Sequence, residues 1–192
     1  MKFNSLLTKT ILLLTGILLL VALPRLVIAQ DTDTLFYENF ESGSLPEDWN
    51  NEYVEGTVKW KYQDGGFKQN PEIEGSGKPP YAYEGVYNAI FHFQSLGGEK
   101  TRLVTKPINL EYRVKPELTF WHAQDERWAV DAYRNDELRV YYKTSQNAPW
   151  IELAEYTSVV SNWKKRSILL PDSSLSDTYY LAFEGKTNNG FG

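Results

Sequence analysis

The sequence lacks cysteine entirely, and its 192 residues include only two histidines, His92 and His122. The absence of cysteine excludes disulfides, thiolate nucleophiles and cysteine-ligated zinc. With two histidines, a histidine-rich zinc site is excluded as well. A fold built from this chain is therefore held by its core or by a metal with oxygen ligands.

Positive charge is also scarce, because 20 Lys and Arg face 25 Asp and Glu, for a net charge of −5. The longest basic run is Lys164-Lys165-Arg166, which is typical of a solvated strand end. Nucleic-acid binding requires a much larger basic surface. We therefore expect no nucleic-acid partner.

Only the N-terminus contains a long hydrophobic run. Lys2 and Lys9 precede an apolar run over residues 11–23, and Val27-Ile28-Ala29 follows. This order is typical of a secretory signal with a small-residue cleavage site. The run is shorter than the roughly 20 residues that span a bilayer. We expect a signal peptide over residues 1–29, cleavage near Ala29, and a secreted or outer-surface domain over residues 30–192 with no membrane span. An uncleaved anchor is the alternative, because Arg25 is a charge close to the cut.

No stretch after residue 30 has the pattern of a long amphipathic helix. Short runs with period-two alternation are instead closed by Gly, Pro, Asn and Asp, as strands are. In residues 57–62, for example, Val58, Trp60 and Tyr62 alternate with lysines. The expected strands are residues 35–40, 57–62, 86–93, 102–110, 117–124, 137–144, 151–156, 164–170 and 178–184. Residues 65–80 are expected to form a long loop. This pattern predicts an all-β, antiparallel, two-sheet sandwich with negligible helix.

The alternation also predicts which side chains supply the core. We expect most of it to come from Phe36, Phe40, Trp60, Ala89, Phe91, Phe93, Leu103, Leu118, Phe120, Leu138, Val140, Tyr142, Ile168, Leu170, Leu181 and Phe183.

A series of motifs along the chain resembles one known group of domains. The motifs are Tyr37-Glu38-Asn39-Phe40-Glu41-Ser42-Gly43, Leu45-Pro46-Glu47-Asp48-Trp49, Arg102-Leu103-Val104-Thr105-Lys106-Pro107-Ile108-Asn109-Leu110, Leu118-Thr119-Phe120-Trp121 and Tyr180-Leu181-Ala182-Phe183-Glu184-Gly185. In order and spacing they resemble the bacterial choice-of-anchor J and cleaved-adhesin domains, which are similar to gingipain adhesin domains and to MAM domains. The resemblance implies a jelly-roll β-sandwich that works as a secreted adhesion or binding module.

The same resemblance implies that one strand is missing. The family closes with a strand containing Asp-Asp after the Phe-Glu-Gly segment, whereas this sequence stops at Gly192. We therefore expect a C-terminally truncated domain without its last strand, and an exposed sheet edge beside residues 35–40.

The resemblance further implies a structural Ca²⁺ where the first strand meets the last. Glu41 is the first ligand candidate and Glu38 the second, because calcium prefers carboxylate and carbonyl oxygens. Asp125 opens an acidic segment that could hold a second ion together with Glu126, Asp131, Asp136 and Glu137. The alternative in both places is ordinary solvated carboxylates.

Several aromatic residues are candidates for stacking on a sugar ring. Trp128 lies in an expected loop, with Tyr133 and Trp150 as weaker candidates. Trp121 has the opposite parity to Phe120, so one of the two points away from the core. Tyr81, Tyr83 and Tyr87 form a second possible platform. The alternative is burial of these rings in the core. The expected partner is an extracellular glycan or a cell-surface protein.

Catalysis is the main competing hypothesis. Glycoside hydrolysis needs two facing carboxyl groups roughly 5–9.5 Å apart, but the strand acids are scattered. Glu152 and Glu155 are expected on opposite strand faces, and no Gly-x-Ser-x-Gly motif supports a histidine triad. We therefore expect a non-catalytic module. The alternatives are a jelly-roll glycoside hydrolase and an inert spacer domain.

Overall fold

The computed structural model describes residues 33–64, 79–91, 98–124, 126–129 and 132–187, with backbone alone for 126–129 and 132–135. The expected signal peptide lies outside these residues. No helix within them is long and apolar enough to cross a membrane.

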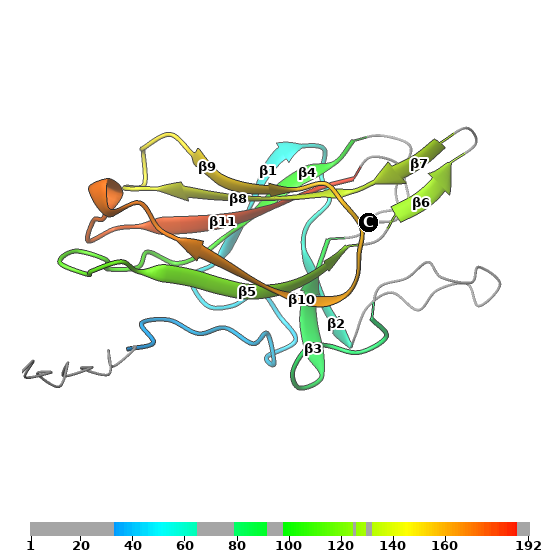
Figure 1. Cartoon of the computed structure of the whole chain (residues 1–192), viewed down its shortest axis with the longest axis horizontal. Coiled ribbons are helices and arrows are strands. Elements are labelled where there is room, and N and C mark those ends of the chain that lie inside the picture. The colour runs from blue at the N-terminus through cyan, green and yellow to red at the C-terminus, as the bar shows by residue number, and fades with distance from the viewer. Residues whose placement is uncertain (1–32, 65–78, 92–97, 125, 130–131, 188–192) are drawn as a thin grey trace, which may run out of the picture. The chain divides into compact units, whose positions relative to one another are not determined.

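Strands make up nearly all regular structure in the described part of the chain (Figure 1). They are β1 (Asn50–Glu55), β2 (Lys61–Asp64), β3 (Tyr87–Ile90), β4 (Lys100–Val104), β5 (Glu117–Gln124), β6 (Glu126–Ala129), β7 (Ala132–Asn135), β8 (Glu137–Lys143), β9 (Ile151–Tyr156), β10 (Val160–Leu169) and β11 (Tyr180–Lys186). The helical content described is one short 3₁₀ turn, Asp172–Ser174. The predicted all-β class with negligible helix is therefore confirmed.

The strands form two layers, which Figure 1 shows one above the other. One layer is a five-stranded sheet in the order β1-β4-β11-β8-β9, and the other contains the β10-β5 pair. Two further pairs, β2-β3 and β6-β7, complete the described strands. Every pairing is antiparallel. This arrangement confirms the predicted antiparallel β-sandwich.

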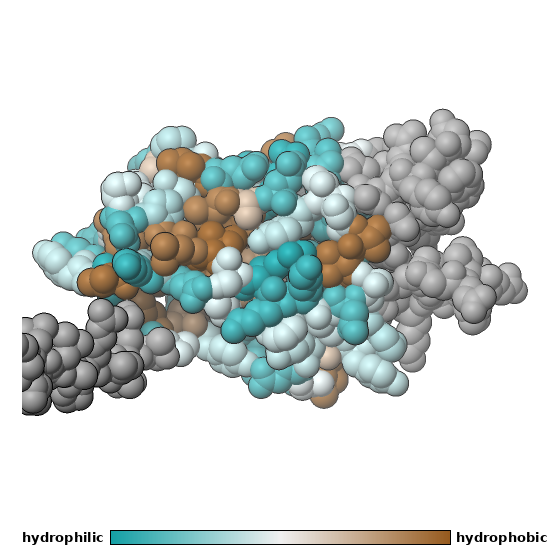
Figure 2. Space-filling model, in the orientation of Figure 1, coloured by the Kyte–Doolittle hydropathy of each residue, from teal (hydrophilic) through white to brown (hydrophobic). Residues whose placement is uncertain are grey.

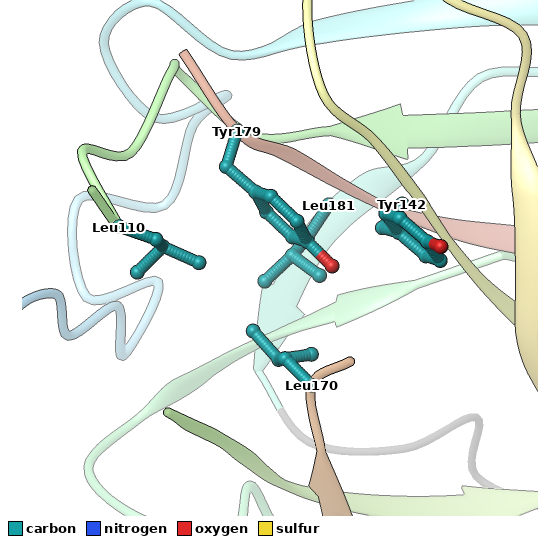
Figure 3. Close-up of a cluster of buried hydrophobic side chains, with 5 residues drawn as sticks. All are labelled: Leu110, Tyr142, Leu170, Tyr179 and Leu181. Atoms are coloured by element: carbon teal, nitrogen blue, oxygen red, sulfur yellow. The ribbon is translucent and has the colours of Figure 1, made fainter. Parts of the chain in front are cut away.

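One cluster of buried hydrophobic side chains is centred on Tyr179 (Figure 3). Leu110, Tyr142, Leu170 and Leu181 surround Tyr179, whose side chain is fully buried. The Tyr142 and Tyr179 rings are stacked, with centroids 5.3 Å apart and planes inclined by 4°. These residues come from β8, β11 and three connections, so the cluster ties both layers together.

The described residues that were predicted for the core are all buried or half-buried, but most of them are only half-buried. Phe91, Leu103, Val140, Tyr142, Leu170 and Leu181 are buried. Phe36, Phe40, Trp60, Ala89, Leu118, Phe120, Leu138, Ile168 and Phe183 are half-buried, and Phe93 lies outside the described residues. Several of the half-buried residues, including Trp60, Phe120 and Phe183, line a cavity of about 180 Å³. The two layers therefore do not close completely over these rings.

The prediction of a first strand over residues 35–40 is wrong, and so is that of a sheet edge beside it. This segment is irregular because its side chains capture backbone donors that a ladder would use. The Phe40 N–H donates to Oε1 of Glu38 at 2.6 Å, and the Glu41 N–H donates to Oδ1 of Asn39 at 3.1 Å. Phe40 also has a φ of 62°, which no strand accommodates. Its ring packs on Trp49, with centroids 6.0 Å apart.

Other strand boundaries also differ from the prediction. The strand expected over residues 57–62 begins only at Lys61, and β1 was missed because Asn50-Asn51-Glu52 is a polar edge segment. The Trp60 N–H instead donates to Oδ1 of Asn51 at 3.0 Å. The segment around Trp128, expected as a loop, forms the β6-β7 pair. Most of the long loop expected over residues 65–80 lies outside the described residues.

Candidate functional site

The two faces of β5 carry different chemistry. Phe120 and His122 point toward the five-stranded sheet, and the Phe120 ring packs edge-on against Phe183 at a centroid distance of 5.2 Å. Trp121 therefore points to the opposite, outer face, where it is 38% exposed. The prediction that either Phe120 or Trp121 leaves the core is confirmed, and Trp121 is the one that does.

Four aromatic residues gather on this outer face, which we call the aromatic platform: Tyr81, Tyr83, Trp121 and Trp163. The Tyr83 ring stacks on Trp121, with centroids 3.9 Å apart and planes inclined by 16°. Trp163 from β10 meets Tyr83 edge-on at 6.5 Å, and its Nε1–H donates to the Tyr81 carbonyl oxygen at 2.8 Å. Tyr81 and Tyr83 remain 75% and 47% exposed. Trp121 and the tyrosines Tyr81 and Tyr83, which the sequence indicates as separate candidates, therefore form one surface.

The segment that carries Tyr83 is fixed by the irregular N-terminal segment. Oε1 of Glu41 accepts the backbone N–H groups of Val86 and Tyr87, both at 2.8 Å. The Tyr37 hydroxyl donates to Oε2 of Glu84 at 2.6 Å. These contacts hold the backbone on either side of Gly85, which has a φ of 66°. Glu41 thus positions the aromatic platform without belonging to it.

The calcium-ligand candidates have other partners in this structure. The Glu38 and Glu41 carboxylates accept the backbone N–H groups described above. No group of three or more acidic or histidine side chains suited to a metal ion occurs among the described residues. Asp125 lies outside them. The described residues therefore do not assemble a calcium cage by themselves, and calcium binding stays a prediction.

Of the remaining sugar-stacking candidates, Trp150 is the one whose side chain the structure describes. Trp128 and Tyr133 are cross-strand neighbours in the β6-β7 pair, but their side chains lie outside the described part. Trp150 donates its Nε1–H to the Glu52 carboxylate at 3.0 Å, and the Lys143 ammonium lies 4.5 Å from its ring centroid. The indole of Trp150 is thus engaged by a carboxylate and an ammonium of the protein itself.

His122 has a structural environment on the inner face of β5. Its side chain is buried, and Nδ1 accepts a hydrogen bond from Nε of Arg166 at 3.2 Å. Burial, together with the nearby charges of Arg166 and Lys164, lowers the pKa of His122 to about 4. The imidazole is therefore neutral at pH 7, with its proton on Nε2. This environment is typical of a buried structural histidine.

The outer face of the five-stranded sheet carries a ladder of alternating charges. The register places Glu52, Arg102, Glu184, Arg139 and Glu155 side by side across β1, β4, β11, β8 and β9. Arg102 pairs with Glu52 at 2.7 Å and with the buried Glu184 at 2.9 Å. Because each acidic residue of the ladder lies beside a basic residue, the charges of the ladder compensate one another.

The ladder corrects one prediction about the acids of β9. Glu152 and Glu155 both reach Arg139, so they lie on the same side of the sheet rather than on opposite faces. The register shifts where Ala154 pairs with Val140 but Glu152 pairs with Tyr141. A bulge of this kind inserts one residue and reverses the expected parity. Both carboxylates are engaged by one guanidinium.

Comparison with known proteins gives a likeness at the level of structure. No family model and no curated protein sequence matches the chain. Among solved structures, it is similar to the carbohydrate-binding module TmCBM61, which was solved in complex with β-1,4-galactotriose. The TM-score is 0.44 at 16% identity, covering 79% of this chain and 86% of that one.

Proposed function

We propose that the chain is a secreted, non-catalytic binding module that recognises an extracellular glycan through the aromatic platform. The observation that carries the proposal is the stacked Tyr83–Trp121 pair, which stays exposed on the outer face of a sheet. Single exposed aromatic rings are common on protein surfaces, whereas a contiguous group of them is typical of a binding surface. A pyranose ring presents an apolar C–H face that such rings can cover.

Two further features support the proposal. The N-terminal segment is typical of a secretory signal, which would deliver the domain to extracellular polysaccharide. The hydrogen bonds that the Glu41 and Glu84 carboxylates accept hold the Tyr83 segment in place before any ligand arrives. A preformed surface avoids much of the ordering cost of binding. The resemblance to choice-of-anchor J and cleaved-adhesin domains agrees with a binding role outside the cell.

The proposal is tested by affinity gel electrophoresis of the purified chain against a panel of soluble extracellular polysaccharides. Trp121→Ala should weaken binding by at least tenfold, as the loss of a central aromatic does at other interfaces. Tyr112→Ala is the matched control, because Tyr112 is 90% exposed and lies outside the platform. Wild-type chain that binds no member of the panel, or equal loss in the two variants, would contradict the proposal.

A further inference from the structure

The platform has a positive charge beside it, and this inference rests on the glycan-binding function proposed above. In the β10-β5 pair, Lys165 is the direct cross-strand partner of Trp121. Direct partners in an antiparallel pair have Cβ atoms roughly 4.5–5.5 Å apart on the same face of the sheet. The Lys165 side chain therefore leaves the sheet on the outer face, next to the indole ring.

Lys165 is exposed, and among the described residues it has no ion-pair partner. Two carboxylates close to the platform each accept a hydrogen bond from a neutral hydroxyl group. The Glu84 carboxylate accepts the hydroxyl of Tyr37, and the Glu117 carboxylate accepts the hydroxyl of Ser167. The ammonium of Lys165 is thus a positive charge beside the aromatic platform that no ion pair of the described residues neutralises.

The positive charge of Lys165 is opposite in sign to the net charge of the chain, which is −5. An acidic protein repels polyanions at long range, so a cation at a binding surface gives a specific local attraction. Lys is a compact point charge that suits carboxylate and sulfate groups alike. The next cross-strand pair on this face, Thr119 and Ser167, adds hydroxyl groups but no second positive charge.

We propose that the glycan bound by the aromatic platform is anionic, and that Lys165 pairs with its carboxylate or sulfate groups. Aromatic rings supply the stacking surface, and the ammonium distinguishes a charged sugar from its neutral counterpart. An exposed ion pair contributes up to about 1 kcal/mol, which corresponds to a three- to fivefold preference per contact.

The test uses two matched ligand pairs with the purified chain: polygalacturonate against its methyl ester, and dextran sulfate against dextran. Within at least one pair, the charged polymer should bind the wild type three- to fivefold more tightly or better. The pair that responds identifies the anionic group. Lys165→Met should remove this preference while keeping binding of the neutral polymer, and Lys165→Arg should retain it.

Lys164→Met is the matched control, because it removes the same charge from the neighbouring position, whose cross-strand partner is the inward-facing His122. Equal effects of Lys164→Met and Lys165→Met would overturn the inference, since they would indicate a net-charge effect. Equal binding of charged and neutral polymers, with loss in Trp121→Ala, would overturn it and leave the proposed function standing. Absence of binding to every polymer would overturn both.

Discussion

The Glu41 carboxylate occupies the space that a side chain on Gly85 would fill. A Cβ built on Gly85 would overlap the carboxyl group of Glu41, and the φ of 66° at Gly85 further favours glycine. The same carboxylate accepts the N–H groups of Val86 and Tyr87. Glu41 and Gly85, which are distant in the sequence, therefore pack against each other next to the segment that carries Tyr83.

The contact between Glu41 and Gly85 predicts that a substitution at either position lowers both the stability of the fold and the affinity for glycan. Glu41→Ala removes the acceptor for two backbone donors and should lower the free energy of unfolding by about 1–2 kcal/mol. Gly85→Ala should cost at least as much, because it adds both overlap and backbone strain. Both variants should weaken glycan binding without altering the platform rings. Denaturant unfolding and affinity electrophoresis measure the two effects.

Glu41→Gln separates this role from the calcium role that the sequence predicts. The amide keeps an oxygen that can accept the same N–H groups, so an anchoring role predicts a small loss that chelator does not change. A ligand role predicts that chelator lowers the wild-type melting temperature to that of Glu41→Gln. Melting scans with calcium and with chelator decide between the two roles.

The Arg102–Glu184 ion pair predicts strong non-additivity. Glu184 is only 4% exposed, so Arg102→Met leaves a buried carboxylate without its nearest cation. Breaking one side of a buried pair costs about 3–5 kcal/mol. The double variant Arg102→Met, Glu184→Leu should recover a large part of that loss, because no unpaired charge remains. Additive losses in a double-mutant cycle would contradict a coupled pair.

Tyr179 should be among the most sensitive positions of the core. Its ring is fully buried and stacks on Tyr142 between the layers (Figure 3). Tyr179→Ala should lower the free energy of unfolding by about 3–5 kcal/mol, as the loss of a buried aromatic ring does. Tyr179→Phe keeps the stacked ring and should cost less than about 1 kcal/mol. Chemical denaturation of both variants measures the difference, and equal losses would contradict it.

His122 predicts a loss of stability in mild acid. Its pKa falls from 6.5 to about 4 on folding, so the folded state binds fewer protons than the unfolded state between these values. The free energy of unfolding therefore falls as pH falls from about 6.5 to about 4, by up to about 3 kcal/mol. Above pH 6.5 this contribution is fully present.

The contribution of His122 is isolated by comparison with His122→Gln. Carboxylates titrate in the same acid range, but they do so in both proteins. The difference in unfolding free energy between wild type and variant should change by up to about 3 kcal/mol between pH 7 and pH 4, with the wild type losing more. A difference that is constant with pH would mean that His122 titrates normally in the folded state.

The surface of the molecule shows why local pattern did not identify the whole site. In Figure 2, hydrophobic residues form patches among hydrophilic ones instead of one continuous surface. Exposed Tyr112 and exposed Tyr81 look alike in the sequence. Only the stacking of Tyr83 on Trp121 and the bond from Trp163 to Tyr81 separate the platform from scattered aromatics. Trp163 was assigned no binding role in the sequence, because nothing in its surroundings indicated one.

The sequence by itself determined the class of the fold and the facing of its central strands. Period-two alternation has one physical meaning in a half-buried strand, so the bounds of β5 and β9 and the opposite facing of Phe120 and Trp121 followed from it. Tertiary structure decided the features that depend on contacts outside the local sequence. Side-chain capture of backbone donors kept residues 35–40 out of the sheet, and a bulge in β9 brought Glu152 and Glu155 to one arginine. Glu41 binds the backbone of the Tyr83 segment, and the β10-β5 register places Lys165 beside Trp121. Both depend on contacts between residues distant in the chain, which only the folded backbone brings together.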